Sequence, residues 1–323
     1  MDRSDPASSN SPIRGRATAE TPPGASSIRP TTGPRIVDAW PPPSLVESIE
    51  RELGPHRSRV ALVLGSGLGG IATSMHMHWS GDAARMPGYP MSSVAGHEGR
   101  LIFGRLPRMR SGESPSHGPW IWVVQGRVHL YEGHAPETVT RYLRLLHALG
   151  VTTLVLTNAA GSVDTRVQPG DLVLADDAIS MFHRPLAPAR TGPHASLWQS
   201  RASALSDPRL IELAEETASA LGIALQRGVL VGSLGPSYET AAEVRAWRRF
   251  GGTVASMSTV PEAVHARELG MNVLLFSLVT NLGTGLSPQR LSHADVVATA
   301  DRAGVRLGTL LTELTFRLGE SDR

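Results

Sequence analysis

From about residue 59 onward, short apolar runs rich in β-branched residues alternate with segments of helical periodicity. Such runs predict buried strands, and their alternation with helices predicts one α/β domain with a mainly parallel, mixed central sheet flanked by helices. The expected strands are Arg59–Leu64, Leu101–Arg105, Trp120–Gln125, Thr153–Thr157, Asp171–Ala175, Gly228–Val231, Thr253–Ser256 and Asn272–Thr280.

Helices are expected between several of these strands. The clearest is Pro136–Leu149, which has proline in its first turn, apolar residues at helical spacing and Gly150 as its terminator. A capping box over Ser44–Glu47 opens the first helix. Further helices are expected at Pro208–Leu221, Glu239–Phe250, Pro261–Leu269 and Ser292–Leu318, and the polar stretch Pro107–Pro119 is expected to form a surface loop.

The N-terminal segment differs in composition from the rest of the chain. Its first 34 residues contain six Pro, six Ser, four Thr and three Gly, with Ile13 and Ile28 as the only branched aliphatic residues. Such a segment buries too little apolar surface to offset the entropy lost on ordering, so we expect a disordered tail over 1–43 and a folded domain over 44–323. The sequence contains no secretory signal or membrane-length apolar run, and we therefore expect a cytoplasmic protein.

The composition excludes several reaction types. All 31 basic side chains are arginine, and the chain has neither lysine nor cysteine. This rules out a Schiff-base lysine, a P-loop lysine, a thiol nucleophile and a thiolate metal site. The absence of lysine and cysteine also explains the pI of about 9.5, because few groups titrate between pH 7 and roughly 10. The high pI is therefore only weak support for a polyanion partner.

Two turns that follow expected strands could bind an anion. Backbone N–H groups of Gly65–Gly70, together with Ser66, could approach an oxyanion closely. The same residues match G-x-G-x-x-G, the fingerprint of nicotinamide-dependent oxidoreductases, but no apolar strand ends in an acidic residue about 20 positions later. The second turn, Ala255–Glu262, enters a proline-initiated helix, where Ser258 or Thr259 could either cap the helix or bind an anion.

Residues 125–133 place three functional side chains at alternate positions. If a strand period of two applies, Arg127, His129 and Tyr131 project from one face. That face would present a permanent cation, an imidazole and a phenol. The alternative is an edge strand with its polar side in water.

Three more strand ends contain small or polar residues. Thr157–Ser162 would permit close approach of a ligand to the backbone. In Gly235–Thr240, Glu239 could accept from the N–H groups of a 6-oxopurine and Tyr238 could pack against a base, although a glutamate in a first helical turn also stabilises the helix dipole. Asn281, at the end of a long strand, could donate to a ring nitrogen.

Taken in order, these segments resemble the trimeric class of purine nucleoside phosphorylases. The resemblance runs from about Val60 to Val297, which is most of the chain. The motifs on which it rests are Gly65–Gly69, Ala95–Arg100, Gln125–Gly133, Thr157–Gly161, Gly235–Thr240, Met257–Glu262, Thr280-Asn281 and His293.

The resemblance implies a homotrimer of nucleoside phosphorylase catalytic domains, acting in purine salvage. It implies cleavage of 6-oxopurine ribo- and deoxyribonucleosides, such as inosine and guanosine, by orthophosphate to give free base and pentose 1-phosphate. No cofactor, metal, nucleic acid or membrane is implied. By motif, Ser66, His97, Arg127, His129, Ala159 and Ser258 would hold phosphate; Tyr131, Met257 and His293 would contact the sugar; Glu239 and Asn281 would hold the base beside Tyr238; and Asn281, Glu239 and His129 would be the catalytic residues.

Other functions compete with this one. A methylthioadenosine phosphorylase of the same fold favours 6-amino purines and generally has Asp where this chain has Asn281. A nicotinamide-dependent oxidoreductase, suggested by Gly65–Gly70, would bind NAD. An RNA-binding protein would bind RNA with an affinity that falls as salt rises. One departure from the family concerns a segment whose aromatic residue closes a neighbouring subunit's sugar site: Phe182–Ser206 has no match to it, and Trp198 is the candidate substitute.

Overall fold

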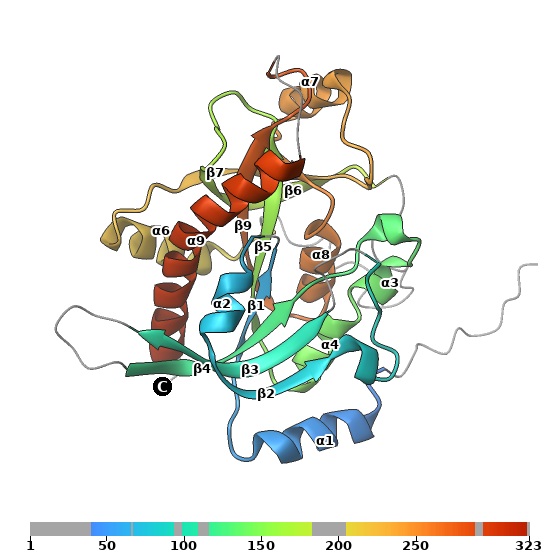
Figure 1. Ribbon diagram of the computed structural model, residues 1–323, viewed down its shortest axis with the longest axis vertical. Coiled ribbons are helices and arrows are strands. Elements are labelled where there is room, and N and C mark those ends of the chain that lie inside the picture. Colours follow the sequence, from blue (N-terminus) through green and yellow to red (C-terminus); the bar gives the residue numbers. More distant parts are fainter. Residues whose placement is uncertain are drawn as a thin grey trace, which may run out of the picture. The chain divides into compact units, whose positions relative to one another are not determined.

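The computed structural model describes residues 40–65, 67–93, 99–108, 116–182, 205–287 and 293–321. Nine strands in this part of the chain form one sheet in the order β2-β3-β4-β1-β5-β8-β7-β6-β9 (Figure 1). They are β1 (Val60–Leu64), β2 (His76–Asp82), β3 (Arg100–Arg108), β4 (Ser116–Gln125), β5 (Thr153–Ser162), β6 (Leu172–Ser180), β7 (Gln226–Gly232), β8 (Val254–Ser256) and β9 (Asn272–Leu282).

The sheet is mixed, as predicted. Strand β1 pairs in parallel with β4 and β5, β5 with β9, and β7 with both β6 and β8. The β2–β3, β3–β4, β5–β8 and β6–β9 pairs are antiparallel. Because β5 also pairs with β9, strands β5, β8, β7, β6 and β9 close into a ring at one end of the sheet.

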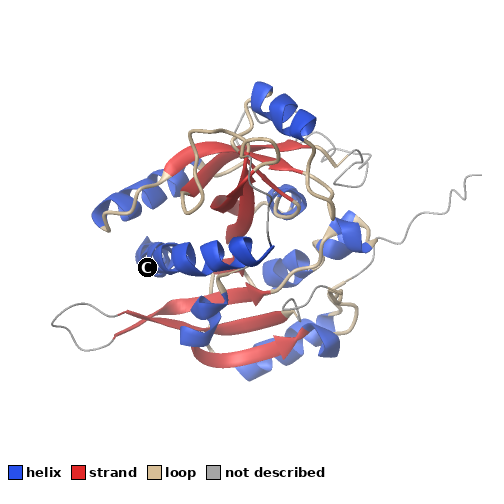
Figure 2. Ribbon diagram, turned by 45° about the horizontal axis from the view of Figure 1, so that its top comes forward, coloured by secondary structure: helices blue, strands red, loops and turns tan. Residues whose placement is uncertain are grey.

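Helices cover both faces of the sheet (Figure 2). Strand β1 shows this: Ala61 and Val63 belong to a core that includes residues of α4 (Tyr142–Ala148) and α8 (Val260–Glu268), whereas Leu62 and Leu64 belong to a second core with α6 (Pro208–Ala220) and α9 (His293–Ser321). No helix of the described chain is long and apolar enough to cross a membrane. The helices are α1 (Pro43–Leu53), α2 (Gly69–Ser74), α3 (Pro136–Val139), α4 (Tyr142–Ala148), α6 (Pro208–Ala220), α7 (Ala241–Arg249), α8 (Val260–Glu268) and α9 (His293–Ser321), with 3₁₀ turns at Ala83–Arg85 and Leu130–Glu132.

Strand β2 was not expected from the sequence. It is the edge of the sheet, and most of its side chains are exposed, so it lacks the apolar pattern that predicts a strand. Its pairing also excludes the dinucleotide fold. After the glycine-rich turn, β2 runs antiparallel to β3 and is separated from β1 by two strands, whereas the dinucleotide fingerprint requires a parallel strand next to β1.

Two helix predictions were partly wrong. Pro136–Leu149 is two helices, α3 and α4, which meet at Thr140: its hydroxyl donates to the Pro136 carbonyl and contacts His265 Nδ1 at 2.5 Å, and so fixes the chain against α8. The Ser44 capping box is absent from the described α1, whose N-cap is Pro42. Pro43 begins the helix two residues earlier than a Ser44 N-cap would, because its fixed φ suits the first helical position. The two ends of the proposed loop Pro107–Pro119 belong instead to β3 and β4, and residues 109–115 lie outside the described residues.

The parallel strands direct the chain to one edge. Strands β1, β4, β5 and β9 run in the same direction, so Leu64, Gln125, Ser162 and Leu282 end them on the same side of the sheet. Ligands of open parallel sheets bind beyond such carboxyl ends. The residues that follow these strands are therefore the first candidates for a site.

Helix α9 packs directly on the glycine-rich turn after β1. Gly67 has a φ of 81°, and a Cβ there would lie 2.5 Å from the Ala300 Cβ. A Cβ at Gly304, one turn further along α9, would lie 2.7 Å from the Gly67 carbonyl oxygen. The helix can approach this backbone only because both positions are glycine.

We expect Gly304→Ala to lower the free energy of unfolding by roughly 1–3 kcal/mol, because the added methyl overpacks a rigid backbone contact. Gly308→Ala on the same helix is the control: its Cβ would meet Ile71 at an ordinary 3.5 Å, and replacing glycine in a helix should stabilise by up to about 1 kcal/mol. Denaturant unfolding measures both values. Equal effects of the two substitutions would contradict the close packing of α9 on Gly67.

Candidate active site

A pocket of about 220 Å³ lies at the carboxyl edge of the sheet. Segments far apart in sequence meet there, as the strand directions require. The lining residues are Gly65, Gly67, Arg127, His129, Asn158–Gly161, Ser233, Tyr238, Glu239, Ala255–Ser258, Thr280, Asn281 and Ala300.

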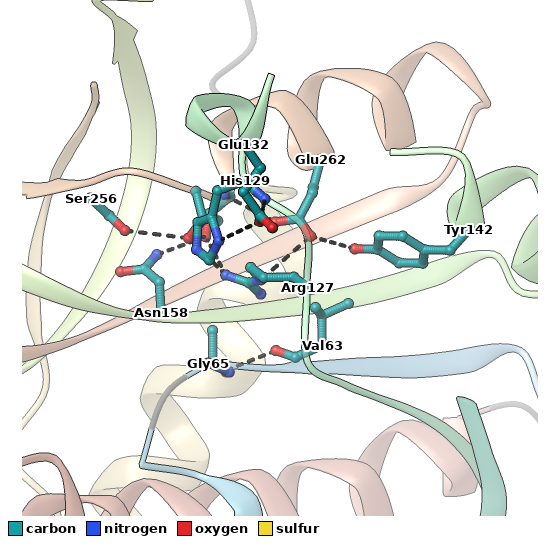
Figure 3. Close-up of polar contacts among 12 residues, drawn as sticks. Val63, Gly65, Arg127, His129, Glu132, Tyr142, Asn158, Ser256 and Glu262 are labelled. Atoms are coloured by element: carbon teal, nitrogen blue, oxygen red, sulfur yellow. Dashed lines mark hydrogen bonds and ion pairs between the residues drawn. The ribbon is translucent and has the colours of Figure 1, made fainter. Parts of the chain in front are cut away.

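Arg127 provides a buried positive charge at one end of the pocket. Its side chain is only 3% exposed. Nη1 donates to the Ser258 hydroxyl at 2.8 Å and to the Thr259 hydroxyl at 3.1 Å. Figure 3 shows the Arg127 side chain next to that of Glu262. A guanidinium and a serine hydroxyl that both face a pocket are donors suited to an oxyanion.

A carboxylate behind Arg127 balances its charge. Glu262 Oε1 lies 3.5 Å from Arg127 Nε and accepts from the Tyr142 hydroxyl at 2.6 Å. The other oxygen of Glu262 accepts from the Thr259 backbone N–H at 3.0 Å, at the start of α8. Burial, followed by the nearby Glu262 charge, raises the pKa of Tyr142 well above its usual value, so this phenol remains a donor.

His129 is held by a second buried carboxylate, Glu132. Its Oε1 accepts from the His129 backbone N–H at 2.6 Å and lies 3.5 Å from Nδ1 of the imidazole. Ser92 and Ser93 also donate to Glu132. Burial alone would raise the pKa of Glu132, but these backbone and hydroxyl donors outweigh it and lower the pKa to about 2. Glu132 therefore joins the segment before residue 94 to the imidazole that lines the pocket.

The glycine-rich turn is fixed against β5. The Thr157 hydroxyl accepts from the Gly65 N–H at 2.9 Å and donates to the Val63 carbonyl at 2.8 Å. A Cβ at Gly65 would lie 2.8 Å from the Asn158 Cα, so only glycine allows the turn to lie this close to the strand.

The opposite end of the pocket contains a carboxylate and an amide. A Cβ on Gly161 would lie 3.0 Å from Asn281 Nδ2 and 3.6 Å from Glu239 Oε1, so both groups border the space above this glycine. The Thr280 hydroxyl donates to Asn281 Oδ1 at 2.9 Å, and Asn281 Nδ2 donates one hydrogen to the Leu282 carbonyl at 3.1 Å, so the second amide hydrogen is the donor left for that space.

The predicted sugar contacts are only partly in the pocket. Met257 lines it, whereas Tyr131 does not; the Tyr131 ring lies 3.1 Å from where a Cβ of Gly235 would be, beside Met257. Tyr238 lines the pocket and is 49% exposed. Burial, then the Glu239 charge, raises the pKa of Tyr238.

The strand period of two considered for Arg127, His129 and Tyr131 does not apply. Strand β4 ends at Gln125, and residues 130–132 form a 3₁₀ turn. The three side chains consequently do not share one strand face. Arg127 and His129 reach the pocket, and the His129 and Tyr131 rings stack at a centroid distance of 4.8 Å. Gly126, with a φ of 83°, turns the chain out of the sheet.

Several predicted residues fall outside the described chain. These are Ser66, His97, the side chain of His293 and residues 183–204, which include Trp198. Their assignments stay predictions. Ala159 and Ser258 line the pocket as expected.

Sequence reasoning missed four residues that act around the pocket. Glu132 lies behind His129, Glu262 lies behind Arg127, Tyr142 donates to Glu262, and Ala300 brings α9 to the pocket wall. Glu262 had a local signal, since it stands three residues after a possible N-cap. Tyr142 had none, because its role depends on a residue 120 positions away.

Comparison with known proteins agrees with this geometry. Residues 59–315 match the family model of the phosphorylase superfamily. The chain is 38% identical over 256 residues to purine nucleoside phosphorylase 1 of Geobacillus stearothermophilus, covering 78% of this chain and 88% of that protein. It is 35% identical over 279 residues to the Rattus norvegicus enzyme, covering 83% and 92% respectively. The chain belongs to the purine nucleoside phosphorylase family.

Solved structures of the family have the same fold. A schistosoma purine nucleoside phosphorylase in complex with hypoxanthine superposes with a TM-score of 0.71 at 30% identity, over 84% of this chain and 95% of that one. The Schistosoma mansoni enzyme with adenosine superposes with a TM-score of 0.70 at 30% identity, over 85% and 96%. The phosphorylase fold expected from the motifs is therefore confirmed.

Replacing Glu132 by glutamine should cost stability in a pH-dependent way. The folded-state pKa of about 2 lies below the ordinary 4.5, so the ionised Glu132 stabilises the fold above pH 4.5 and loses this effect as pH falls towards 2. At pH 7 we expect Glu132→Gln to unfold with a free energy lower by roughly 2 kcal/mol. The difference in free energy of unfolding between wild type and Glu132→Gln should become smaller below pH 4.5, and denaturant unfolding measures it.

Glu137→Gln is the control, because it makes the same chemical change at an exposed position five residues later. A Glu132→Gln deficit that stays constant between pH 7 and pH 3 would contradict the role of the charge.

Proposed function

We propose that this phosphorylase catalyses the reversible phosphorolysis of 6-oxopurine ribo- and deoxyribonucleosides, including inosine and guanosine, to free base and pentose 1-phosphate. The observation that supports it is the polarity of one pocket: Arg127 and Ser258 offer oxyanion donors at one end, and Glu239 with Asn281 offers an acceptor and a donor at the other.

The base end suits a 6-oxopurine. Such a base has an N1–H donor, which the Glu239 carboxylate can accept, and an unprotonated N7, to which Asn281 Nδ2 can donate. A 6-amino purine has no N1–H: its N1 is an acceptor and would place a lone pair opposite the partly buried carboxylate. Two acceptors that face each other leave the carboxylate poorly satisfied, which favours the 6-oxo form.

The two ends together fit the reaction. Cleavage of the glycosidic bond develops positive charge on the sugar and negative charge on the purine. Asn281 would stabilise the departing base at N7, while an oxyanion held by Arg127, His129 and Ser258 would stabilise the cation and attack C1′. Neither a covalent enzyme intermediate nor a cofactor enters this scheme.

Further parts of the proposal rest on the family motifs. They are the assembly as a homotrimer, a cytoplasmic location, the roles of Ser66, His97 and His293, and a catalytic domain over 44–323 preceded by the tail. A methylthioadenosine phosphorylase is the competing function, and Asn281 argues against it.

An inosine assay with and without orthophosphate tests the function. Hypoxanthine should form only with phosphate, and ribose 1-phosphate should appear in equal amount. Guanosine should be cleaved comparably, while adenosine and methylthioadenosine should be cleaved far more slowly. Hypoxanthine release at the same rate without phosphate would mean hydrolysis and would contradict the proposal. A preference for methylthioadenosine over inosine would favour the methylthioadenosine phosphorylase instead.

Asn281→Ala should lower kcat for inosine by about 100- to 1,000-fold, because one transition-state hydrogen bond is worth about 2.7–4 kcal/mol. Asn272→Ala is the matched control, since it removes an exposed asparagine at the other end of the same strand. Steady-state kinetics at saturating phosphate measures both. A loss below tenfold in Asn281→Ala would be inconsistent with its assigned contact to N7.

A further inference from the structure

Thr259 lies directly behind the anion end of the pocket and is fully buried. Its hydroxyl accepts from Arg127 Nη1 at 3.1 Å and from Asn158 Nδ2 at 3.1 Å. It also lies 3.2 Å from the Ser258 hydroxyl. These contacts join segments from three different parts of the chain.

The donors and acceptors determine where the hydroxyl hydrogens point. A guanidinium and an amide NH₂ can only donate, so Arg127 and Asn158 occupy both lone pairs of the Thr259 oxygen. The Thr259 hydrogen must then donate, and the Ser258 oxygen is the neighbouring acceptor. Ser258 thus receives hydrogens from Arg127 and from Thr259.

The Ser258 hydrogen therefore cannot point toward Arg127 or Thr259. Both lone pairs of its oxygen are occupied, so its own hydrogen points away from Arg127 and Thr259. Ser256 Oγ, at 3.4 Å, is a distant partner, and Ser256 and Ser258 both line the pocket. The Ser258 hydrogen is accordingly available to an oxygen of a bound anion.

The backbone at Thr259 is shaped for this contact. Its φ of 74° is the only positive value of a non-glycine residue in the described chain, and a β-branched residue adopts such a value only with strain. The Glu262 carboxylate, which accepts the Thr259 N–H at 3.0 Å, holds that conformation. A residue that only capped α8 would not need such a backbone, because N-caps ordinarily have extended angles.

We propose that Thr259 is a positioning residue for the oxyanion co-substrate: its hydroxyl orients the Ser258 hydrogen and the Arg127 guanidinium toward the bound anion. The proposal rests on the proposed phosphorolysis and deepens it, because it names a buried residue that sets phosphate affinity without touching phosphate.

The test compares Thr259→Val, which keeps the shape and removes the hydroxyl, with Thr259→Ser, which keeps the hydroxyl. We expect Thr259→Val to raise the KM for orthophosphate about tenfold and to leave the KM for inosine within about twofold. Thr259→Ser should restore the KM for phosphate to within about threefold of wild type. Thr217→Val is the control, because it removes another fully buried threonine hydroxyl, on α6.

A second readout does not depend on turnover. Inorganic phosphate should raise the Tm of wild type and Thr259→Ser, and should raise that of Thr259→Val much less at the same concentration. If Thr259→Val does not fold, Asn158→Ala frees one lone pair of the Thr259 oxygen without changing the cap, and should also raise the KM for phosphate.

The outcomes distinguish a failure of this inference from a failure of the proposed function. A folded Thr259→Val with a lower Tm but an unchanged KM and Tm response for phosphate would make Thr259 a helix cap only and overturn the inference; so would an unchanged phosphate KM in Asn158→Ala. Phosphate-independent cleavage of inosine by wild type would instead overturn the proposed function.

Discussion

The buried guanidinium of Arg127 determines how this end of the pocket is built. Removing a cation from water costs several kcal/mol unless a counter-charge and hydrogen bonds replace the lost solvent. Glu262 provides the charge, and the hydroxyls of Ser258 and Thr259 provide acceptors on the pocket side. Tyr142 then saturates Glu262 from α4. One buried charge thus ties the end of β4, α4 and the start of α8 into a single arrangement.

The long central strands hold the two ends of the pocket apart. Strand β5 contributes Asn158 and Ala159 near Arg127 and Gly161 near Asn281, and β9 runs beside it for its whole length before ending in Asn281 and Leu282. Strands paired on both sides move little, so the distance between anion donors and base contacts is set before any ligand binds. Preorganisation of this kind is where enzymes obtain much of their electrostatic stabilisation of the transition state.

The strands that were predicted correctly from the sequence are those whose side chains are buried. Strands β1, β5 and β9 have apolar residues on both faces because helices cover both faces, and continuous apolar runs are the clearest strand signal. Strand β2 is exposed and has no such signal. At residues 127–131, alternating polar residues suggested a strand, but Gly126 has a left-handed backbone and ends the pairing of β4 with its neighbours. The spacing of polar residues along the chain cannot show where the hydrogen bonds between strands stop.

The sequence by itself determined the alternation of strands and helices, the absence of lysine and cysteine chemistry, and the motifs that mark the family, because these depend on residue type and short-range spacing. The tertiary structure decided which motifs share a cavity, that Glu132 and Glu262 stand behind the histidine and the arginine, and that the Thr259 hydroxyl lies between Arg127 and Ser258. Those contacts join residues up to 132 positions apart. Their partners are set by the pairing and packing of whole elements, which local patterns do not encode.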